Sequence, residues 1–509
     1  MRLFSCLFSS SNEKTVPVHP KKIPQFSFPI SQKSLQVVFA GCTDFSLRTV
    51  SPGGNSGQEV SLCWVDGLVS AETISRDVLR PLTDAARLHA GDGDALMEQI
   101  LRGAVWACGA QRCTEMDTLV KALLSGSCAV VFDGPGTAVT FEVRANNTRA
   151  VSQPTVEKTV KGGKDAFVEV LRTNTALVRR RLRDPALKLL QFTVGRKSGT
   201  PVAVMYLDGV ANPDTLAELR RRLEAIDIDG LTAAGNLEQY LADSPDSPFP
   251  LFLHTERPDR FAAELLAGRI GILADGLPMG FLLPATLAKF MQVAEDRAQH
   301  FLVASGLTVL RWISALLSAL FPAILVAVSM YHQEMIPTKL LLSMIEAKQN
   351  VPFSEAVEVL TMLVAFELLM EAGIRLPDPV GDTVSIIGAL IVGQSAVEAR
   401  VVSPITVIVV ATSAICGFTL PSRDLGAALR LVRFGMVLLA VFLGLYGISV
   451  GLALLVWYLS SLESFGVAYT SPMAEGGFRA VLYGLLRPPL RVTKLREAAL
   501  HTPDRRNQK

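Results

Sequence analysis

Cysteine is scarce in this chain, and the cysteines that are present are scattered. The sequence has seven cysteines and no Cys-x-x-Cys pair, and the closest spacing is Cys108 to Cys113. Structural zinc sites and thioredoxin-type redox sites need their ligands in closer register, so the pattern disfavours both. We therefore expect no metal site, and we expect the soluble part to be reduced and to face the cell interior.

The sequence also lacks the motifs of the common enzyme classes. It has no G-x-G-x-x-G, Walker or G-x-S-x-G pattern, which are the signatures of dinucleotide, phosphate and ester chemistry. Histidine is rare, and His254 stands alone before the segment 255–259. We therefore expect neither enzymatic activity nor a cofactor.

Net charge and N-terminal hydrophobicity are low as well. The formal charge is +2, which gives no reason to expect binding to nucleic acid. Residues 1–12 hold one arginine and a broken apolar stretch that is too short for the hydrophobic region of a signal peptide. The sequence predicts a flexible segment over residues 1–35 and an N-terminal domain that stays in the cytoplasm.

The first half of the chain contains an internal repeat. An apolar stretch ends in Asp66-Gly67, and a similar stretch ends in Asp208-Gly209, 142 residues later. A second motif has the same offset, in the pairs Leu123/Leu265, Gly126/Gly268 and Asp133/Asp275. Because two separate motifs share one offset, we infer a tandem duplication. We expect one α/β repeat over residues 36–145 and another over 146–290, with the matching fold in 178–290.

Each repeat is predicted to run strand, Asp-Gly turn, helix, helix, strand, turn, strand. Apolar positions spaced by three and four predict helices at residues 70–82 and 212–223, and short Val/Ile/Phe runs bounded by glycine predict the strands. We interpret the four aspartates of these Asp-Gly pairs as turn and helix-capping residues. No carboxylates or histidines close in sequence suggest another role for them.

One basic run stands out in the soluble half. Arg179, Arg180 and Arg181 lie on a predicted helix. They form either a solvated helix face or a contact with acidic lipid headgroups or an acidic partner. Nucleic acid is a poorer partner, because no aromatic residues alternate with the arginines. A linker rich in proline and serine follows at residues 243–250.

Apolar residues concentrate after residue 300. Half of the chain is hydrophobic and the mean hydropathy is +0.36, and a helix needs about twenty apolar residues to cross a bilayer. Suitable stretches lie at residues 312–330, 401–420 and 434–462, and a shorter one at 383–397 pairs with 401–420 as a hairpin. The sequence predicts an all-α transmembrane bundle of four to five spans over residues 291–462, followed by a basic tail over 463–509.

One apolar segment, residues 357–374, carries acids. Glu367, Glu371 and Arg375 are spaced by four, so they lie on one helical face, and Glu358 lies further back. If the helix lies in the membrane plane, these acids face headgroups or cytosol. If it spans the membrane, they need a partner or a polar path. An ion pair between Glu371 and Arg375 is the structural alternative to an ion path.

Topology signals conflict in the last part of the chain. The arginine-rich loop 421–433 and the basic tail both favour the cytoplasmic side, yet one long apolar stretch separates them. Either one signal misleads or the chain folds back. In that stretch Gly444, Gly447 and Gly451 share a face, which suits close helix packing with a partner or a second copy, although the same glycines also permit a bend.

Several ordered motifs resemble the GerA family of bacterial spore germinant receptors, specifically the A subunit. They include the segments 171–174, 226–230, 255–259, 268–276, 335–337, 351–353, 366–377 and 464–472. The resemblance covers roughly residues 36–490. The chain departs from the family pattern at residues 161–165, where Lys-Gly-Gly-Lys-Asp replaces Arg-Gly-Pro-Arg-Glu, and at Met370, where the family often has arginine.

The resemblance implies a nutrient-responsive complex in the inner membrane of the endospore. It further implies a transporter-like B subunit and a lipoprotein C subunit as partners, contact with membrane lipids, and a homo-oligomer that forms or gates an ion path. An accessory germination protein encoded with the SpoVA proteins is the alternative within the family. A secondary transporter, a different class, is disfavoured because the repeat lies in the soluble half and not in the membrane half.

Overall fold

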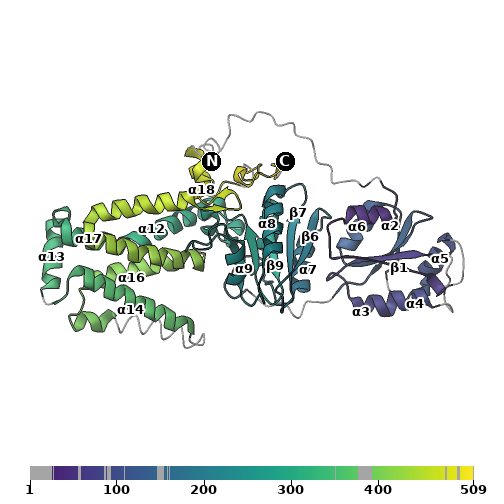
Figure 1. Cartoon of the computed structure of the whole chain (residues 1–509), viewed down its shortest axis with the longest axis horizontal. Helices are drawn as coiled ribbons and strands as arrows, with labels where there is room; N and C mark the ends of the chain where they lie inside the picture. Colours follow the sequence, from purple (N-terminus) through teal and green to yellow (C-terminus); the bar gives the residue numbers. More distant parts are fainter. Residues whose placement is uncertain are drawn as a thin grey trace. The chain divides into compact units, whose positions relative to one another are not determined.

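The fold is described from a computed structural model (Figure 1). It describes residues 26, 28–54, 59–84, 88, 93–107, 109–145, 154–157, 159, 161–349, 351–375, 393–475, 478–489 and 493–507. The chain forms two compact units. The α/β unit comprises residues 1–245, 252–285 and 490–509, and the helical unit comprises residues 246–251 and 286–489.

The first repeat is a five-stranded antiparallel sheet covered by helices on both faces. Its strand order is β1-β2-β4-β5-β3. The strands are β1 Phe45–Val50, β2 Val60–Val65, β3 Gln111–Cys113, β4 Ser127–Phe132 and β5 Thr137–Glu142. The helices are α2 Gln32–Val38, α3 Ala71–Thr73 with its continuation η2 Ile74–Leu79 and α4 Arg80–Thr83, α5 Gly93–Gln99 with η3 Ile100–Ala104, and α6 Met116–Leu124.

Alternation along the strands divides the core of this repeat in two. Ala129 and Val131 of β4 pack with Leu35 and Leu119 of α2 and α6, whereas the neighbouring positions of β4 pack with the helices α3 to α5. Such two-sided burial is what a strand without polar positions predicts. Because α2 is part of this core, the repeat begins earlier than predicted, inside the segment expected to be flexible.

The second repeat has the same topology. Its strand order is β6-β7-β9-β10-β8, which matches the first repeat strand for strand. The strands are β6 Leu187–Val194, β7 Thr200–Leu207, β8 Leu253–Thr255, β9 Ile270–Ala274 and β10 Gly280–Leu283. The helices are α7 Leu171–Arg181, α8 Pro213–Ala225, α9 Ala234–Leu241 and α10 Pro258–Ala267.

The offset of 142 also holds for hydrogen bonds. The Asp66 amide donates to the Asp44 carbonyl at 2.8 Å, and the Asp208 amide donates to the Ala186 carbonyl at 2.8 Å. Gly67 and Gly209 both have positive φ, 82° and 72°, which glycine adopts without strain. The two repeats predicted from the sequence therefore agree in strand order and in the backbone geometry of these turns.

One detail of the turns differs from the prediction. Asp66 and Asp208 do not cap the helices that follow them, whereas Asp133 and Asp275 accept hydrogen bonds from the first amides of α2 and α7. Ser70 accepts a hydrogen bond from the Thr73 amide, and Asn212 accepts one from the Asp214 amide, again 142 residues apart. Short hydroxyl and amide side chains suit this position because their oxygen reaches the free N–H groups of the first turn.

The helical unit is built from helices, some of them long and apolar. They are α11 Leu287–Phe290, α12 Phe301–Tyr331, α13 Thr338–Lys348, α14 Glu355–Arg375, α16 Pro404–Phe418, α17 Arg423–Ser461 and α18 Phe478–Leu485, with a short hairpin of β11 Glu463–Ser464 and β12 Val467–Ala468. Among the described residues, α12 and α17 are long and apolar enough to cross a membrane, and α16 is a shorter apolar helix. Most of the predicted span 383–397 lies outside the described residues.

Candidate functional site

The basic run on α7 is not a solvated face. The Arg179 side chain is 1% exposed, and its guanidinium donates two hydrogen bonds to Asp44, Nε to Oδ2 at 2.7 Å and Nη2 to Oδ1 at 2.8 Å. Burial opposes the charge, but the adjacent Asp44 carboxylate outweighs it and raises the pKa of Arg179. The expected contact of Arg179 with headgroups or a partner is therefore wrong, because the residue joins α7 to the first repeat.

The two following arginines are also engaged. Arg180 donates to the Ala145 carbonyl at 3.0 Å, and Arg181 is paired with Asp165. Asp165 belongs to the segment 161–165 that departs from the family pattern, so an acid–arginine contact is present despite the changed sequence. A contact of Arg180 and Arg181 with lipid or partner stays a prediction.

The acidic helix predicted in the second half is α14. The Glu367 side chain is 39% exposed, and Glu371 is exposed as well. The helix ends at Arg375, whose side chain lies outside the described residues. The spacing of four residues therefore places Glu367 and Glu371 one turn apart on a helix that is otherwise mostly apolar.

The described partners of Glu367 come from α17. Its carboxylate lies 3.4 Å from Arg430 Nε and 3.8 Å from Arg433 Nη2. Arg433 is buried, with Nη1 3.4 Å from Ser413 Oγ of α16, and its Nε has no hydrogen-bond partner among the described groups. A guanidinium buried among apolar helices is costly unless it is paired. Glu367, Arg430 and Arg433 are therefore one loosely coupled charged cluster that links α14 to α17.

A second polar cluster was not predicted. Glu355 and Glu358 at the start of α14 are buried, and Lys348 Nζ lies 2.8 Å from Glu355 and 3.5 Å from Glu358. Thr406 donates to Glu355 at 2.7 Å. Glu358 accepts the Ser403 amide at 2.7 Å, at the N-terminus of α16, where the helix dipole favours negative charge. This cluster ties together α13, α14 and α16.

Small side chains bring α12 and α16 together. Ser413 Oγ donates to the Ser318 carbonyl at 2.8 Å, and a Cβ added at Gly417 would lie 3.1 Å from Ser318 Oγ. Alanine and serine occupy the buried face of α12, together with Thr308, Pro322 and Val326. Small residues that let helix backbones approach closely are typical of helix packing within membranes.

The helix α17 reverses direction at Gly444. This glycine has φ 61° and ψ −142°, a conformation that is almost confined to glycine. A Cβ added at Gly451 would lie 2.6 Å from Met436 Sδ, whereas residues fifteen apart in a straight helix are about 22 Å apart. Residues 423–443 and 445–461 therefore form two antiparallel arms (Figure 1).

The reversal corrects one prediction and resolves a conflict. Gly447 and Gly451 pack on Met436, Leu439 and Leu443 of the same chain, so Gly444, Gly447 and Gly451 serve a bend and not contact with a second copy. Because of the reversal, the second arm of α17 runs back toward the end of the helical unit at which the first arm begins. The arginine-rich loop 421–433 and the segment after residue 461 can therefore lie on one side of the membrane, as both charge signals require.

Other contacts within the helical unit agree with this arrangement. At one end, Tyr331 Oη at the end of α12 donates to the Val441 carbonyl at 2.5 Å, next to the reversal. At the other end, the Leu287 amide of α11 donates to the Tyr469 carbonyl at 2.8 Å, after the second arm. The two arms and α12 therefore extend over the same length.

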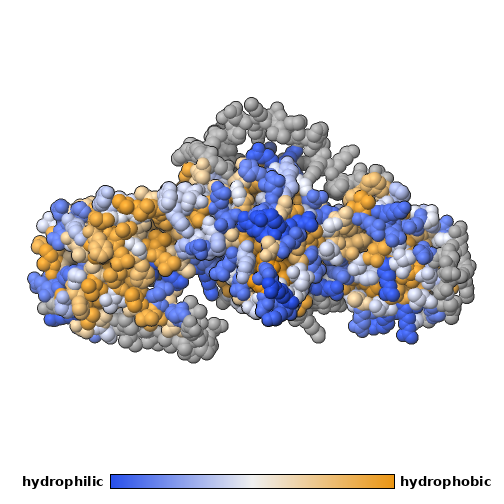
Figure 2. Space-filling model, in the orientation of Figure 1, coloured by the Kyte–Doolittle hydropathy of each residue, from blue (hydrophilic) through white to orange (hydrophobic). Residues whose placement is uncertain are grey.

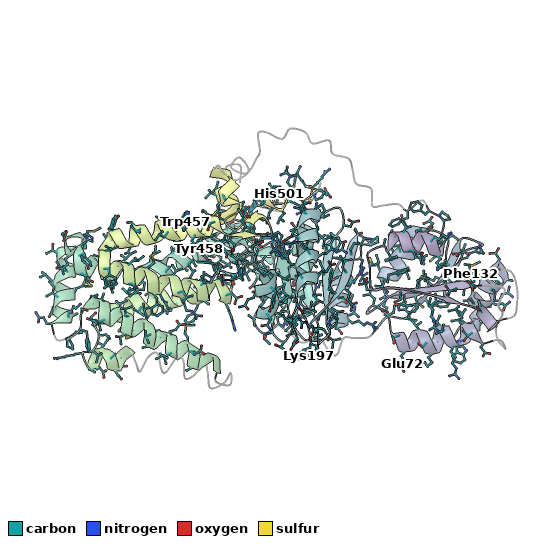
Figure 3. The ribbon with its side chains drawn as sticks, viewed as in Figure 1. Glu72, Phe132, Lys197, Trp457, Tyr458 and His501 are labelled. Atoms are coloured by element: carbon teal, nitrogen blue, oxygen red, sulfur yellow. The ribbon has the colours of Figure 1, made fainter. Side chains whose placement is uncertain are left out.

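The outer surface of the helical unit is apolar. Large exposed side chains include Ile408, Phe418, Phe442 and Trp457, and Figure 2 shows hydrophobic colour over these helices. Trp457 is 69% exposed on the second arm of α17, beside Tyr458 (Figure 3). Soluble proteins rarely expose such large apolar areas. The fold and the site therefore define a class, an α/β domain joined to a helical domain whose surface suits lipid.

Comparison with known proteins identifies the family. The family model described as Bacillus/Clostridium GerA spore germination protein matches residues 33–499. The chain is 35% identical to spore germination protein KA of Bacillus subtilis (strain 168), over 92% of this chain and 85% of that protein. It is 33% identical to spore germination protein GerLA of Bacillus cereus, over 91% and 93%. The protein belongs to the GerA family of spore germination proteins, as a homologue of their A subunits.

Two further similarities complete the comparison. The membrane protein YfkQ of Bacillus subtilis (strain 168) is 35% identical over 86% of this chain and 84% of its own length. The crystal structure of the N-terminal domain of the A subunit of the Bacillus megaterium spore germinant receptor GerK3 is 27% identical, and the match covers 52% of this chain and 99% of that chain with a TM-score of 0.40. The protein is thus a membrane protein of spore germination.

Proposed function

We propose that this protein is the A subunit of a nutrient-responsive germinant receptor in the inner membrane of the endospore. In this proposal it assembles with B and C subunits and with further copies of itself, and the assembly forms or gates a path for monovalent cations. Family membership supports the subunit role. The observation that carries the ion path is the pair of carboxylates one turn apart on a helix of the membrane unit, the partly exposed Glu367 and the exposed Glu371.

The physical argument rests on the cost of exposing charge to lipid. A carboxylate in the hydrocarbon core costs several kcal/mol or more unless it is paired or meets water. The Glu367 carboxylate lies 3.4 Å and 3.8 Å from two arginines, and its Oε2 atom is buried without a hydrogen-bond partner among the described groups. The side chain is nevertheless 39% exposed, and this exposed part must face water, headgroups or another chain. Acids that face a shared aqueous path attract cations.

The course of the chain supports an even number of membrane crossings. Residues before 246 and residues 490–509 belong to the same compact α/β unit. A chain that leaves this unit and returns to it on one side of a membrane crosses an even number of times, which is incompatible with five spans. We place the α/β unit and the basic segment 490–509 in the cytoplasm, in accord with the arginine-rich loop 421–433.

The subunit role predicts a defined complex. An affinity-tagged copy, purified from spore membranes in mild detergent, should bring down the B and C subunits encoded with it, and spores that lack it should lose the response to one nutrient while they still germinate with other triggers. Purification with SpoVA proteins instead, and a general slowing with every nutrient, would show the accessory protein of the same family. Recovery without either set of partners would overturn the receptor assignment.

A further inference from the structure

The outer edge of the second sheet is covered by chain from the first repeat. The Asp208–Ala186 hydrogen bond sets the pairing of β6 with β7, so alternate residues of β6, including Leu189, direct their N–H and C=O groups outward. The Leu189 amide donates to the Gly41 carbonyl at 3.2 Å, and the Thr43 amide donates to the Leu189 carbonyl at 3.0 Å. A short turn segment thus forms an isolated parallel bridge, Cys42 to Leu189, with this edge strand.

The equivalent edge of the first sheet is open. The Asp66–Asp44 hydrogen bond sets the same register for β1 and β2, so Leu47 and Thr49 direct their backbone groups outward. Leu47 is the counterpart of Leu189 at the offset of 142. Among the residues that the structure describes, no group bonds to the outward N–H or C=O of Leu47 or Thr49. This edge can therefore accept an added strand.

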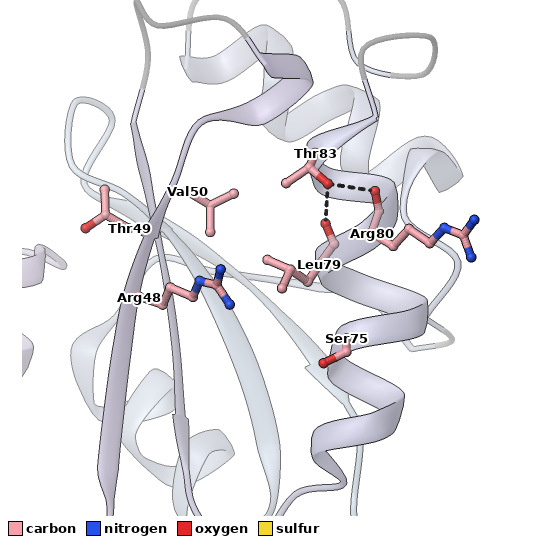
Figure 4. Close-up of a pocket in the computed structure, with 7 residues that line it drawn as sticks. All are labelled: Arg48, Thr49, Val50, Ser75, Leu79, Arg80 and Thr83. Atoms are coloured by element: carbon pink, nitrogen blue, oxygen red, sulfur yellow. Dashed lines mark hydrogen bonds between the residues drawn. The ribbon is translucent and has the colours of Figure 1, made fainter.

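A groove with two arginines lies beside the open edge (Figure 4). Its volume is about 490 Å³, and its walls are Arg48, Thr49 and Val50 of β1 and Ser75, Leu79, Arg80 and Thr83 of the facing helix. The Arg48 side chain extends from β1 on the helix side of the strand in Figure 4. No acid lines the groove, and neither arginine has an ion pair within the described part of the chain, so the groove favours a carboxylate.

Two occupants from this chain itself are poor fits. The N-terminal segment 1–25 has four basic residues and one acid, so its charge opposes that of the arginines. A second copy could offer residues 183–185, the counterparts of the segment that covers β6. In that segment Arg183 is positively charged, like the two arginines of the groove. Pro185 is the counterpart of Thr43 but lacks the backbone N–H that Thr43 donates. Neither supplies both the acid and the backbone donor.

We propose that the outer edge of β1 binds an extended, acidic segment of another protein by strand addition. Backbone hydrogen bonds to Leu47 and Thr49 give affinity, and Arg48 and Arg80 select an acidic side chain. This interaction is independent of the ion path, and it gives the α/β unit a partner on the side of the membrane where that unit lies.

The test is site-specific photo-crosslinking in the full-length protein. A photoreactive residue in place of the exposed Ser75, in spore membranes, should give one crosslinked peptide that is acidic and comes from another protein. In that background, R48E and T49P should each lower the yield roughly tenfold, the affinity change that about 1.4 kcal/mol gives. R48E reverses the selecting charge, and T49P removes one outward N–H at a position where an edge strand tolerates proline.

Two matched variants serve as controls. R112E changes an exposed arginine on β3, at the other edge of the same sheet, and Q191P alters the counterpart of Thr49 on β6. Both should leave the crosslink unchanged. The proposal fails if there is no crosslinked protein, if the peptide is basic or belongs to residues 1–25 or a second copy, or if the yield is the same in R48E and T49P as in the two controls.

Discussion

Gly447→Ala should destabilise the membrane unit by on the order of 3 kcal/mol or more, in the upper range for overpacking a well-packed core. The added Cβ would lie 2.2 Å from the Leu439 carbonyl oxygen and 2.8 Å from Leu443 Cβ. Because the obstacle is backbone of the opposite arm, no side-chain rotation relieves the clash, and the two arms of α17 must separate.

The measurement is accumulation in the membrane together with thermal unfolding in detergent. Gly435→Ala is the matched control, because Gly435 lies on the first arm of the same helix and a Cβ there meets no atom within 4 Å. Alanine in a helix interior is favourable relative to glycine by about 1 kcal/mol, so this variant should be as stable as the parent or more so. Equal stability of the two variants would show that the arms do not pack as described.

Arg179→Met should destabilise the α/β unit by about 3–5 kcal/mol, the cost of removing one partner of a buried ion pair. The change leaves the Asp44 carboxylate, 8% exposed, without its guanidinium partner. Methionine fills part of the same volume but donates no hydrogen bond, so the loss is electrostatic and not a matter of packing alone.

Two further variants make this prediction specific. Replacing both partners, Asp44→Asn with Arg179→Met, should recover part of the lost stability because no uncompensated charge stays buried. Arg172→Ala removes an exposed pair with Asp66, which contributes at most about 1 kcal/mol. Thermal unfolding and protease resistance of the full chain rank the stabilities of these three variants. A double variant less stable than Arg179→Met would contradict the account.

The repeated fold could be predicted because two motifs recur in the sequence at the same offset of 142 residues. The Asp-Gly and Leu-Leu-x-Gly motifs occupy turns, and most of their glycines have positive φ, namely Gly67, Gly126, Gly209, Gly268 and Gly276. The edge strands β3 and β8 were missed because each has only three residues. Three residues are too few to show the alternation of apolar and polar positions that identifies a strand. The strands β1 and β6 lie outside both motifs, and no motif indicated them.

The site was less predictable, because its contacts join residues far apart in the chain. Arg179 was expected on a solvated face or in contact with headgroups or a partner, because its partner Asp44 is 135 residues away in the chain. Glu355 and Glu358 depend on Thr406 and Ser403 of another helix, and Glu367 on the arginines of α17. The three glycines of α17 suggested close packing, yet sequence alone did not say whether the neighbour was another chain or the same one.

The central proposal is that carboxylates of α14 line a cation path, and the rate of monovalent-cation release from spores after nutrient addition tests it most directly. Glu367→Gln keeps the shape and removes the charge, so we expect normal accumulation and assembly with release slowed roughly three- to tenfold, a change of about 1 kcal/mol in barrier. Glu367→Asp keeps the charge and should restore most of the rate. Normal release from a normally assembled Glu367→Gln receptor would contradict the claim. Failure of that variant to accumulate, with Glu367→Asp stable, would instead assign Glu367 to a structural ion pair with Arg430 and Arg433.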